Sequence, residues 1–148
     1  MATKITNRIT INVPLRHLDT IKPALDRLTL IAGGVTGTAG YGVWFDANGT
    51  RHRDDLVVLT WHFTDEASLS VDSAARMLVD DLFAAGEKSV FKDRFYTGKV
   101  AGMLSNVHGF KVAPGHATRI IYPMPLYTKT TNPLGVIADD QSLRHLNS

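Results

Sequence analysis

Carboxylates and aromatic rings that could hold a cationic ligand occur in two regions of the chain. Asp54 and Asp55 open one apolar stretch, and Glu87 shortly precedes another, while Tyr41 and Trp44 come just before the aspartates. Carboxylates neutralise a positive charge, and aromatic rings attract cations with about 0.5–2 kcal/mol. We expect these five residues to meet at one rim of a sheet or across a subunit boundary. The alternative is that the aspartates form a solvated cluster with the neighbouring arginines and that the glutamate is a turn residue.

A second pattern consists of two His-x-Thr motifs, His62 with Thr64 and His116 with Thr118. Residues i and i+2 of a strand share a face, so each pair would point in one direction. Two such pairs facing each other across a cleft resemble the site of two-histidine phosphoesterases, where one histidine is the base and the other the acid. Those enzymes have two similar lobes, whereas this sequence offers regular elements for one. The alternative is that His62 is a strand residue without a chemical role.

The composition excludes several classes of protein. Apolar residues make up 44% and charged residues 20% of the 148 residues, as in soluble globular proteins. The absence of cysteine excludes disulfides, thiolate zinc sites and cysteine nucleophiles. A net charge of +2 without basic runs gives no footprint for nucleic acid. No apolar run is long enough for a membrane span or a signal peptide. We therefore expect a soluble protein of the cytoplasm, with no metal, no cofactor and no nucleic-acid or membrane partner.

The hydrophobic pattern predicts the elements that must position these residues. Alternation at period two predicts strands, apolar stripes at period 3.6 predict helices, and Asn48-Gly49 predicts a hairpin turn. Strands are expected at 8–15, 37–45, 50–63 and 89–96, helices from Asp19 or Thr20 to about Ile31 and from Ser68 or Ser70 to about Ala85, a loop at 100–112 and a further strand at 116–126. This order is typical of an α+β, ferredoxin-like βαββαβ antiparallel sheet with two helices on one face, here followed by a C-terminal strand and an extended arm.

Residues 1–122 are thus expected to form one ferredoxin-like domain, and 123–148 a proline-containing arm. The two helices should leave one face of the sheet bare, with Trp44, Trp61 or Phe63 on it, depending on register. A bare aromatic face usually becomes an oligomer interface or a ligand platform, and we expect a homotrimer. Asp72 and Arg76 are spaced as a solvated i,i+4 pair on a helix surface. His17 and His108 lack ligand spacing and are expected at the surface.

The turn and strand motifs resemble those of a group of small phage and bacterial ferredoxin-like proteins. The motifs are Gly-Gly-Val-Thr at 33–36, Gly-Val-Trp-x-Asp-x-x-Gly at 42–49, an acidic residue heading an apolar strand, a helix, and Glu-x-x-Val at 87–90; the similarity covers roughly residues 5–112. Within this group the phage S-adenosylmethionine lyases have a known chemistry. The resemblance implies that Asp54 or Asp55 is the hairpin carboxylate, Glu87 the last-strand carboxylate and Tyr41 the active-site tyrosine. The hairpin acid in such enzymes is a glutamate, so the aspartate here is one methylene shorter.

The resemblance also implies a reaction that needs little from the protein. The methionine carboxylate of the substrate attacks its own γ-carbon, which expels methylthioadenosine and gives homoserine lactone. The protein would fold the substrate and exclude water, with a carboxylate on the substrate ammonium and Trp44 and Asp55 as further binding residues. We therefore expect a phage-type S-adenosylmethionine lyase that acts as an oligomer in the host cytoplasm. The alternatives are a non-enzymatic oligomeric protein, structural (a virion component) or ligand-binding, which the arm favours, and the two-histidine phosphoesterase.

Overall fold

The computed structural model describes residues 6–123, and the predicted βαββαβ order of the core is confirmed. Each of the four predicted strands of this core is found within one residue of its expected bounds, and a further helix and a fifth strand follow. The strands are β1 (Asn7–Pro14), β2 (Thr36–Phe45), β3 (Arg51–Phe63), β4 (Val90–Tyr96) and β5 (Gly115–Ile121), and the helices are the 3₁₀ turn η1 (Leu15–His17), α1 (Lys22–Ala32), α2 (Ser68–Ala84) and α3 (Gly98–His108).

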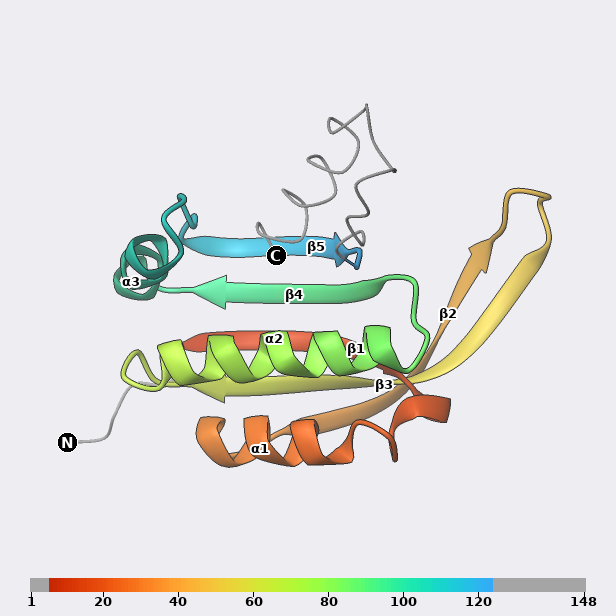
Figure 1. Ribbon diagram of the computed structural model, residues 1–148, viewed down its shortest axis with the longest axis horizontal. Helices are drawn as coiled ribbons and strands as arrows, with labels where there is room; N and C mark the ends of the chain where they lie inside the picture. The colour runs from red at the N-terminus through yellow and green to blue at the C-terminus, as the bar shows by residue number, and fades with distance from the viewer. Residues whose placement is uncertain (1–5, 124–148) are drawn as a thin grey trace, which may run out of the picture.

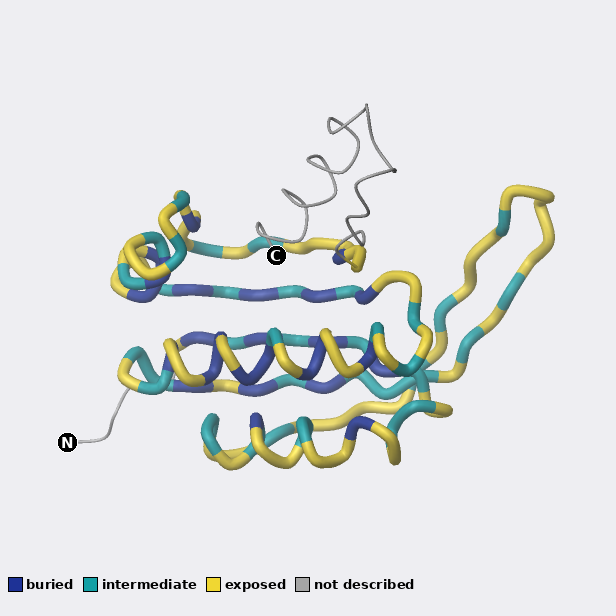
Figure 2. The backbone as a smooth tube through the Cα atoms, viewed as in Figure 1, coloured by how far each residue is buried: buried dark blue, intermediate teal, exposed yellow. Residues whose placement is uncertain are grey.

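The five strands form one antiparallel sheet in the order β2-β3-β1-β4-β5. Helices α1 and α2 lie side by side on one face of it, as Figure 1 shows. The β2–β3 hairpin continues beyond the body of the sheet as a projecting arm, and its exposed tip is visible in Figure 2. The fold is therefore the α+β, ferredoxin-like arrangement that the sequence predicts, extended by an edge strand.

The strand register decides which aromatic residues belong to the core. Ile9 pairs with Trp61, and Asn7 pairs with Phe63, so all four side chains share one face. All four are buried on the side of the helices, where the Trp61 indole Nε1 donates to Thr29 Oγ1 of α1 at 3.0 Å. The expectation that Trp61 or Phe63 lies on the bare face is therefore wrong, because the period-two pattern aligns them with the buried face of β1.

Residues 98–108 form a helix, which corrects the predicted loop at 100–112. The Thr97 side-chain Oγ1 caps α3 by accepting from the Val100 amide at 3.2 Å, and Gly109 ends it with φ +74°. Two glycines within the segment hide this helix in the sequence, since glycine has a low helix propensity. The further strand is confirmed as β5, which ends at Ile121. The arm, apart from Pro123, lies outside the described residues.

Asp72 and Arg76 form the predicted i,i+4 pair, but the pair is not solvated as the sequence predicts. Asp72 is buried, and its Oδ2 contacts Arg76 Nε at 3.2 Å and His108 Nε2 at 2.9 Å. His108 thus joins α3 to α2 instead of lying free at the surface. Burial lowers the pKa of nearby Lys92 to about 8, an effect that the Asp72 carboxylate opposes. The pair is part of a buried polar cluster because α3, missed in the sequence, covers this end of α2.

A second polar network, with Asn7 at its centre, closes the N-terminal end of β1. The fully buried Asn7 amide donates to Asp65 Oδ1 at 2.8 Å and to the Phe63 carbonyl at 3.3 Å, and its oxygen accepts from the Thr97 amide at 2.9 Å. The Thr97 hydroxyl also donates to Asp65 at 3.0 Å. These bonds keep the pKa of Asp65 below its usual value. The network ties the start of α3 to the ends of β1 and β3.

Candidate functional site

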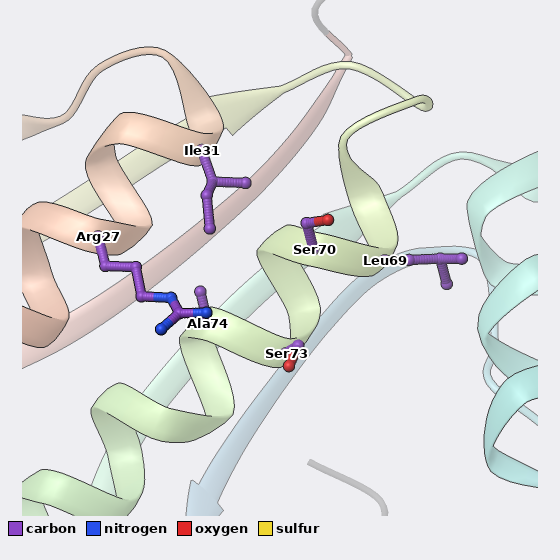
Figure 3. A pocket seen from close by; sticks show the side chains of 6 residues that line it. All are labelled: Arg27, Ile31, Leu69, Ser70, Ser73 and Ala74. Carbon is purple, nitrogen blue, oxygen red and sulfur yellow. The ribbon is translucent and has the colours of Figure 1, made fainter.

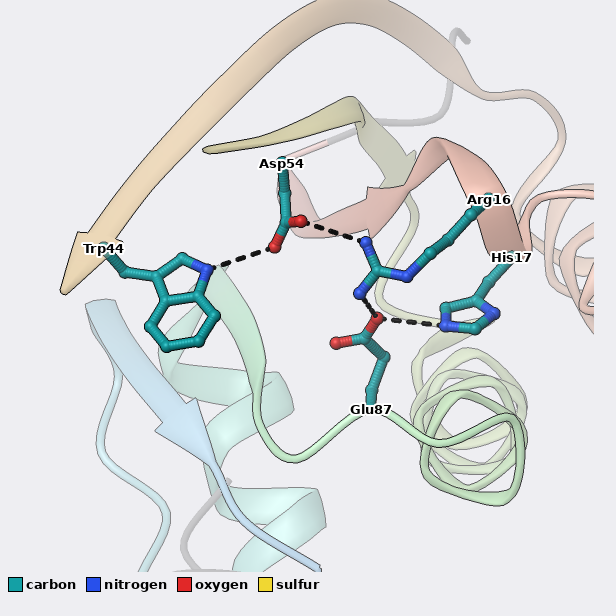
Figure 4. A network of polar contacts seen from close by, with 5 residues as sticks. All are labelled: Arg16, His17, Trp44, Asp54 and Glu87. Carbon is teal, nitrogen blue, oxygen red and sulfur yellow. Dashed lines mark hydrogen bonds and ion pairs between the residues drawn. The ribbon is translucent and has the colours of Figure 1, made fainter. Parts of the chain in front are cut away.

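The predicted meeting of carboxylates occurs at the end of the sheet where β1 stops and β4 begins. Arg16 and His17 lie in η1, directly after β1, and Glu87 lies in the loop before β4. Asp54 is in β3 and Trp44 in β2, both in the projecting arm. Figure 4 shows these five side chains converging from three separate parts of the chain. We call this group the Arg16 site.

A single guanidinium joins the two carboxylates of the Arg16 site. Arg16 Nη1 donates to Asp54 Oδ1 at 3.0 Å, and Arg16 Nη2 donates to Glu87 Oε1 at 2.6 Å. Each carboxylate has a further partner: Trp44 Nε1 donates to Asp54 Oδ2 at 3.3 Å, and His17 Nε2 lies 3.1 Å from Glu87 Oε1. Charge-assisted hydrogen bonds of this kind are stronger and more directional than those between neutral groups.

The acids lie deeper than the arginine that bridges them. The side chain of Glu87 is 14% exposed and that of Asp54 is 32% exposed, whereas the Arg16 side chain is 53% exposed. Two carboxylates face one guanidinium, so the site carries excess negative charge whenever His17 is neutral. Such a site favours a ligand with a positive charge. In this structure the Arg16 guanidinium provides that charge.

The tip of the hairpin arm holds the Trp44 indole in place. Asp46 accepts from the backbone amides of Asn48 and Thr50, both at 2.9 Å, and its Oδ2 contacts His52 Nε2 at 2.9 Å. These hydrogen bonds lower the pKa of Asp46, and the bond to His52 has the largest effect. The His52 ring stacks on Trp44 with 4.2 Å between the ring centroids. Side chains therefore connect the turn to Asp54 through His52 and Trp44.

Three of the five residues predicted from the sequence come together: Trp44, Asp54 and Glu87. Tyr41 and Asp55 lie directly opposite each other on the other face of the hairpin. There the Arg53 guanidinium lies 4.4 Å from the Tyr41 ring centroid and 3.5 Å from Asp55 Oδ1. Neighbouring residues of a strand point to opposite faces, so Asp54 and Asp55 cannot serve one pocket on the same face.

Arg16 and His17 are the residues that sequence reasoning missed. The sequence predicts His17 at the surface, but its side chain is 16% exposed and contacts Glu87. The available signal is their position: both directly follow β1, at the same rim as the predicted carboxylates. Residues after a strand end are placed by the sheet even when their own segment has no periodicity.

The two predicted His-x-Thr pairs do not share a site. His62 pairs with Arg8, Arg8 with Phe95, and Phe95 with His116, so the histidines lie in one row across four strands. Three strand spacings separate their backbones by about 14 Å. His116 instead contacts Asp93 at 2.5 Å. A common phosphodiester cannot bridge this distance, so the geometry gives no support to the two-histidine arrangement.

Other regions of the described chain offer less chemistry. A pocket of about 290 Å³ lies between α1 and α2, and Figure 3 shows the six residues that line it: Arg27, Ile31, Leu69, Ser70, Ser73 and Ala74. Among residues 6–123, no group of three or more histidine, aspartate or glutamate side chains is placed to hold a metal ion. In the same part of the chain, no helix has the length and apolar character needed to cross a membrane.

Comparison with known proteins shows similarity of fold. A phage SAM lyase, solved in complex with S-methyl-5'-thioadenosine, aligns with 86% of this chain and 98% of its own, at a TM-score of 0.51 and 12% identity. A Bacillus cereus protein related to NIF3 aligns with 94% of this chain and 50% of its own, at a TM-score of 0.38 and 12% identity. The sequence matches no protein-family model and no curated protein.

Proposed function

We propose that the Arg16 site binds the sulfonium of S-adenosylmethionine and that the protein is a phage-type S-adenosylmethionine lyase. The observation that carries the proposal is the convergence of Asp54 and Glu87 at one rim of the sheet, beside the Trp44 indole. Excess negative charge suits a cationic substrate, and the indole offers a flat surface next to it. The structural similarity to a phage SAM lyase supports the fold that this proposal needs.

The reaction would be an intramolecular displacement. A carboxylate oxygen of the substrate forms a bond to its own γ-carbon, and the bond from that carbon to sulfur breaks. The electron pair of the broken bond neutralises the sulfonium, so methylthioadenosine and homoserine lactone leave without any proton transfer. Glu87 and Asp54 would orient the substrate through its ammonium and sulfonium, and a folded substrate shielded from water is the main requirement for rate.

Tyr41 and Asp55 enter the proposal only through association of subunits. They lie on the face of the hairpin arm that points away from Trp44 and Asp54, and Tyr41 is 62% exposed. In a homo-oligomer this face would contribute to the site of a neighbouring copy. A trimer is the assembly that we favour for this domain.

The direct test is incubation of the purified protein with S-adenosylmethionine and detection of methylthioadenosine and homoserine lactone. Glu87→Gln keeps the shape and removes the charge, and loss of a charge-assisted contact worth about 1.5–3 kcal/mol should reduce turnover roughly ten- to a hundredfold. The other glutamate of the chain, Glu66, is exposed, so Glu66→Gln is the matched control and should retain full activity. His62→Ala should also retain it.

The proposal fails if the protein neither binds nor cleaves S-adenosylmethionine at millimolar concentration. Unchanged turnover in Glu87→Gln would show that the Glu87 carboxylate has no role in the reaction. Activity of the wild type on a cyclic phosphodiester, abolished by His62→Ala, would instead favour the two-histidine phosphoesterase.

The second candidate function is assembly without catalysis, as a structural or ligand-binding oligomer. The observation that favours it is the group of exposed apolar side chains on one face of the projecting arm, namely Tyr41, Val43 and Phe45. Exposed apolar patches commonly mark protein interfaces. Light scattering should give a mass above that of the 16.2 kDa chain, and deletion of 127–148 should weaken association without unfolding the sheet. A stable monomer would contradict the assembly role.

A further inference from the structure

We propose that Arg16 is a specificity-determining residue: its guanidinium occupies the place of the ligand's cation and must be displaced when the ligand binds. This inference rests on the proposed function, because it concerns the same site. It predicts that the site admits ligands according to their charge.

The position of the guanidinium is that of a bound cation. Two different nitrogens of Arg16 contact two different carboxylates, which come from β3 and from the loop before β4. Arg16 is therefore the contact that joins Asp54 of β3 to Glu87 of the loop before β4. A positive group between them compensates their repulsion, and in the absence of ligand Arg16 is that group.

Each carboxylate is also held by a residue other than Arg16. Trp44 Nε1 donates to the Asp54 oxygen that Arg16 leaves free, and His17 Nε2 contacts Glu87. Figure 4 shows these two holders on either side of the guanidinium. If Arg16 moves out, both carboxylates keep a partner and their orientation. The site is therefore preorganised for a substitute cation, which lowers the cost of binding it.

Arg16 is the part of the site that can leave most easily. Its side chain is 53% exposed and starts from a three-residue 3₁₀ turn, whereas the Glu87 side chain is 14% exposed. Ion pairs at this exposure stabilise a fold only weakly, so water can replace the contacts of Arg16 at small cost. A cationic ligand that replaces Arg16 gains contacts with both carboxylates, whereas a neutral ligand cannot neutralise their negative charge.

Calorimetric binding of two adenosine ligands tests the proposal. Sinefungin carries an amine where S-adenosylmethionine has its sulfonium and cannot release a thioether, and S-methyl-5'-thioadenosine is neutral. Arg16→Gln should bind sinefungin roughly five- to tenfold more tightly than the wild type, while binding of the neutral ligand stays within about twofold. Arg27→Gln removes the same charge from the exposed surface of α1, outside the Arg16 site, and should change neither affinity. Weaker sinefungin binding in Arg16→Gln would overturn the proposal, because Arg16 would then anchor the ligand's carboxylate.

A second measurement keeps this inference separate from the proposed function. In Arg16→Ala, methylguanidinium should bind between the carboxylates at millimolar concentration and shift the NMR signal of the Trp44 indole N–H, which contacts Asp54. The Trp61 indole, bonded to Thr29 in the core, should not shift. If methylguanidinium shifts the Trp44 signal but the protein binds no adenosine ligand, the lyase function is refuted and the cation site between the carboxylates is supported. An unshifted Trp44 signal in the variant would refute the displaceable arginine even if the wild type is a lyase.

Discussion

Both ends of β1 carry a polar network that joins three distant parts of the chain, but the two networks differ in depth. At the N-terminal end, the fully buried Asn7 of β1 links the end of β3 to the start of α3. At the C-terminal end, the half-exposed Arg16 links β3 to the loop before β4. Buried hydrogen bonds specify a fold because losing a partner leaves a desolvated group, whereas exposed ion pairs can exchange with water or with a ligand. We therefore expect the first network to control stability and the second to control binding.

The largest effect is expected at the buried end. Asn7→Ala removes the partner of the Thr97 amide and of Asp65, and should lower the free energy of unfolding by about 2–4 kcal/mol in urea denaturation. Asn12→Ala, in the same strand but on the face opposite to the helices, is the matched control and should cost less than about 1 kcal/mol. Equal losses in the two variants would remove the distinction between the networks.

The next effect depends on pH. The pKa of Asp65 is lower in the folded state than its ordinary value of 3.8, so its stabilisation is present above that value and is lost as the pH falls through the folded pKa. Asp65→Asn should lower the free energy of unfolding by about 1–2 kcal/mol at neutral pH, and the gap to the wild type should close below pH 3.8. Acid denaturation curves measure this, and a gap that is independent of pH would contradict the assignment.

A smaller and local effect is expected at the tip of the arm. Gly49 has φ +78°, which a β-branched side chain adopts only with strain, so Gly49→Val should cost about 1 kcal/mol. Because the tip projects beyond the body, the loss should appear as broadening of the Trp44 indole signal while that of Trp61 stays sharp. Equal broadening of both signals would mean that the arm and the core unfold together.

The smallest change in stability is expected at the Arg16 site itself. Arg16→Gln and Glu87→Gln should each change the free energy of unfolding by less than about 1 kcal/mol. Both remove an ion pair whose arginine is half-exposed, and a glutamine at position 87 can still accept from His17. Their effects on ligand binding should be far larger. If either variant lost as much free energy of unfolding as Asn7→Ala, the network at the C-terminal end of β1 would have to be structural as well.

The strand pattern is sufficient to predict the hairpin, the βαββαβ order of the core and the rim where Arg16 joins Asp54 and Glu87, but not helix α3. The same period-two rule also separates Tyr41 from Trp44, since an odd number of steps along a strand changes the face; applied strictly, it would have divided the five predicted site residues into two groups. Arg16 could not be assigned as a partner from sequence, because its contacts depend on where the arm of β3 and the loop before β4 lie in space.

The turn at Asp46 determines which residues of the arm can meet Asp54. A slip of β2 by one residue against β3 would exchange the two faces of β2. Trp44 would then point away from Asp54, and the face that carries Tyr41 would lie beside Asp54 instead. Edge strands with several glycines define their register weakly, and β2 contains Gly37, Gly40 and Gly42. The two backbone amides that Asp46 binds fix the loop length and therefore the register. The turn at Asp46, which is not part of the Arg16 site, thus sets whether Trp44 faces Asp54.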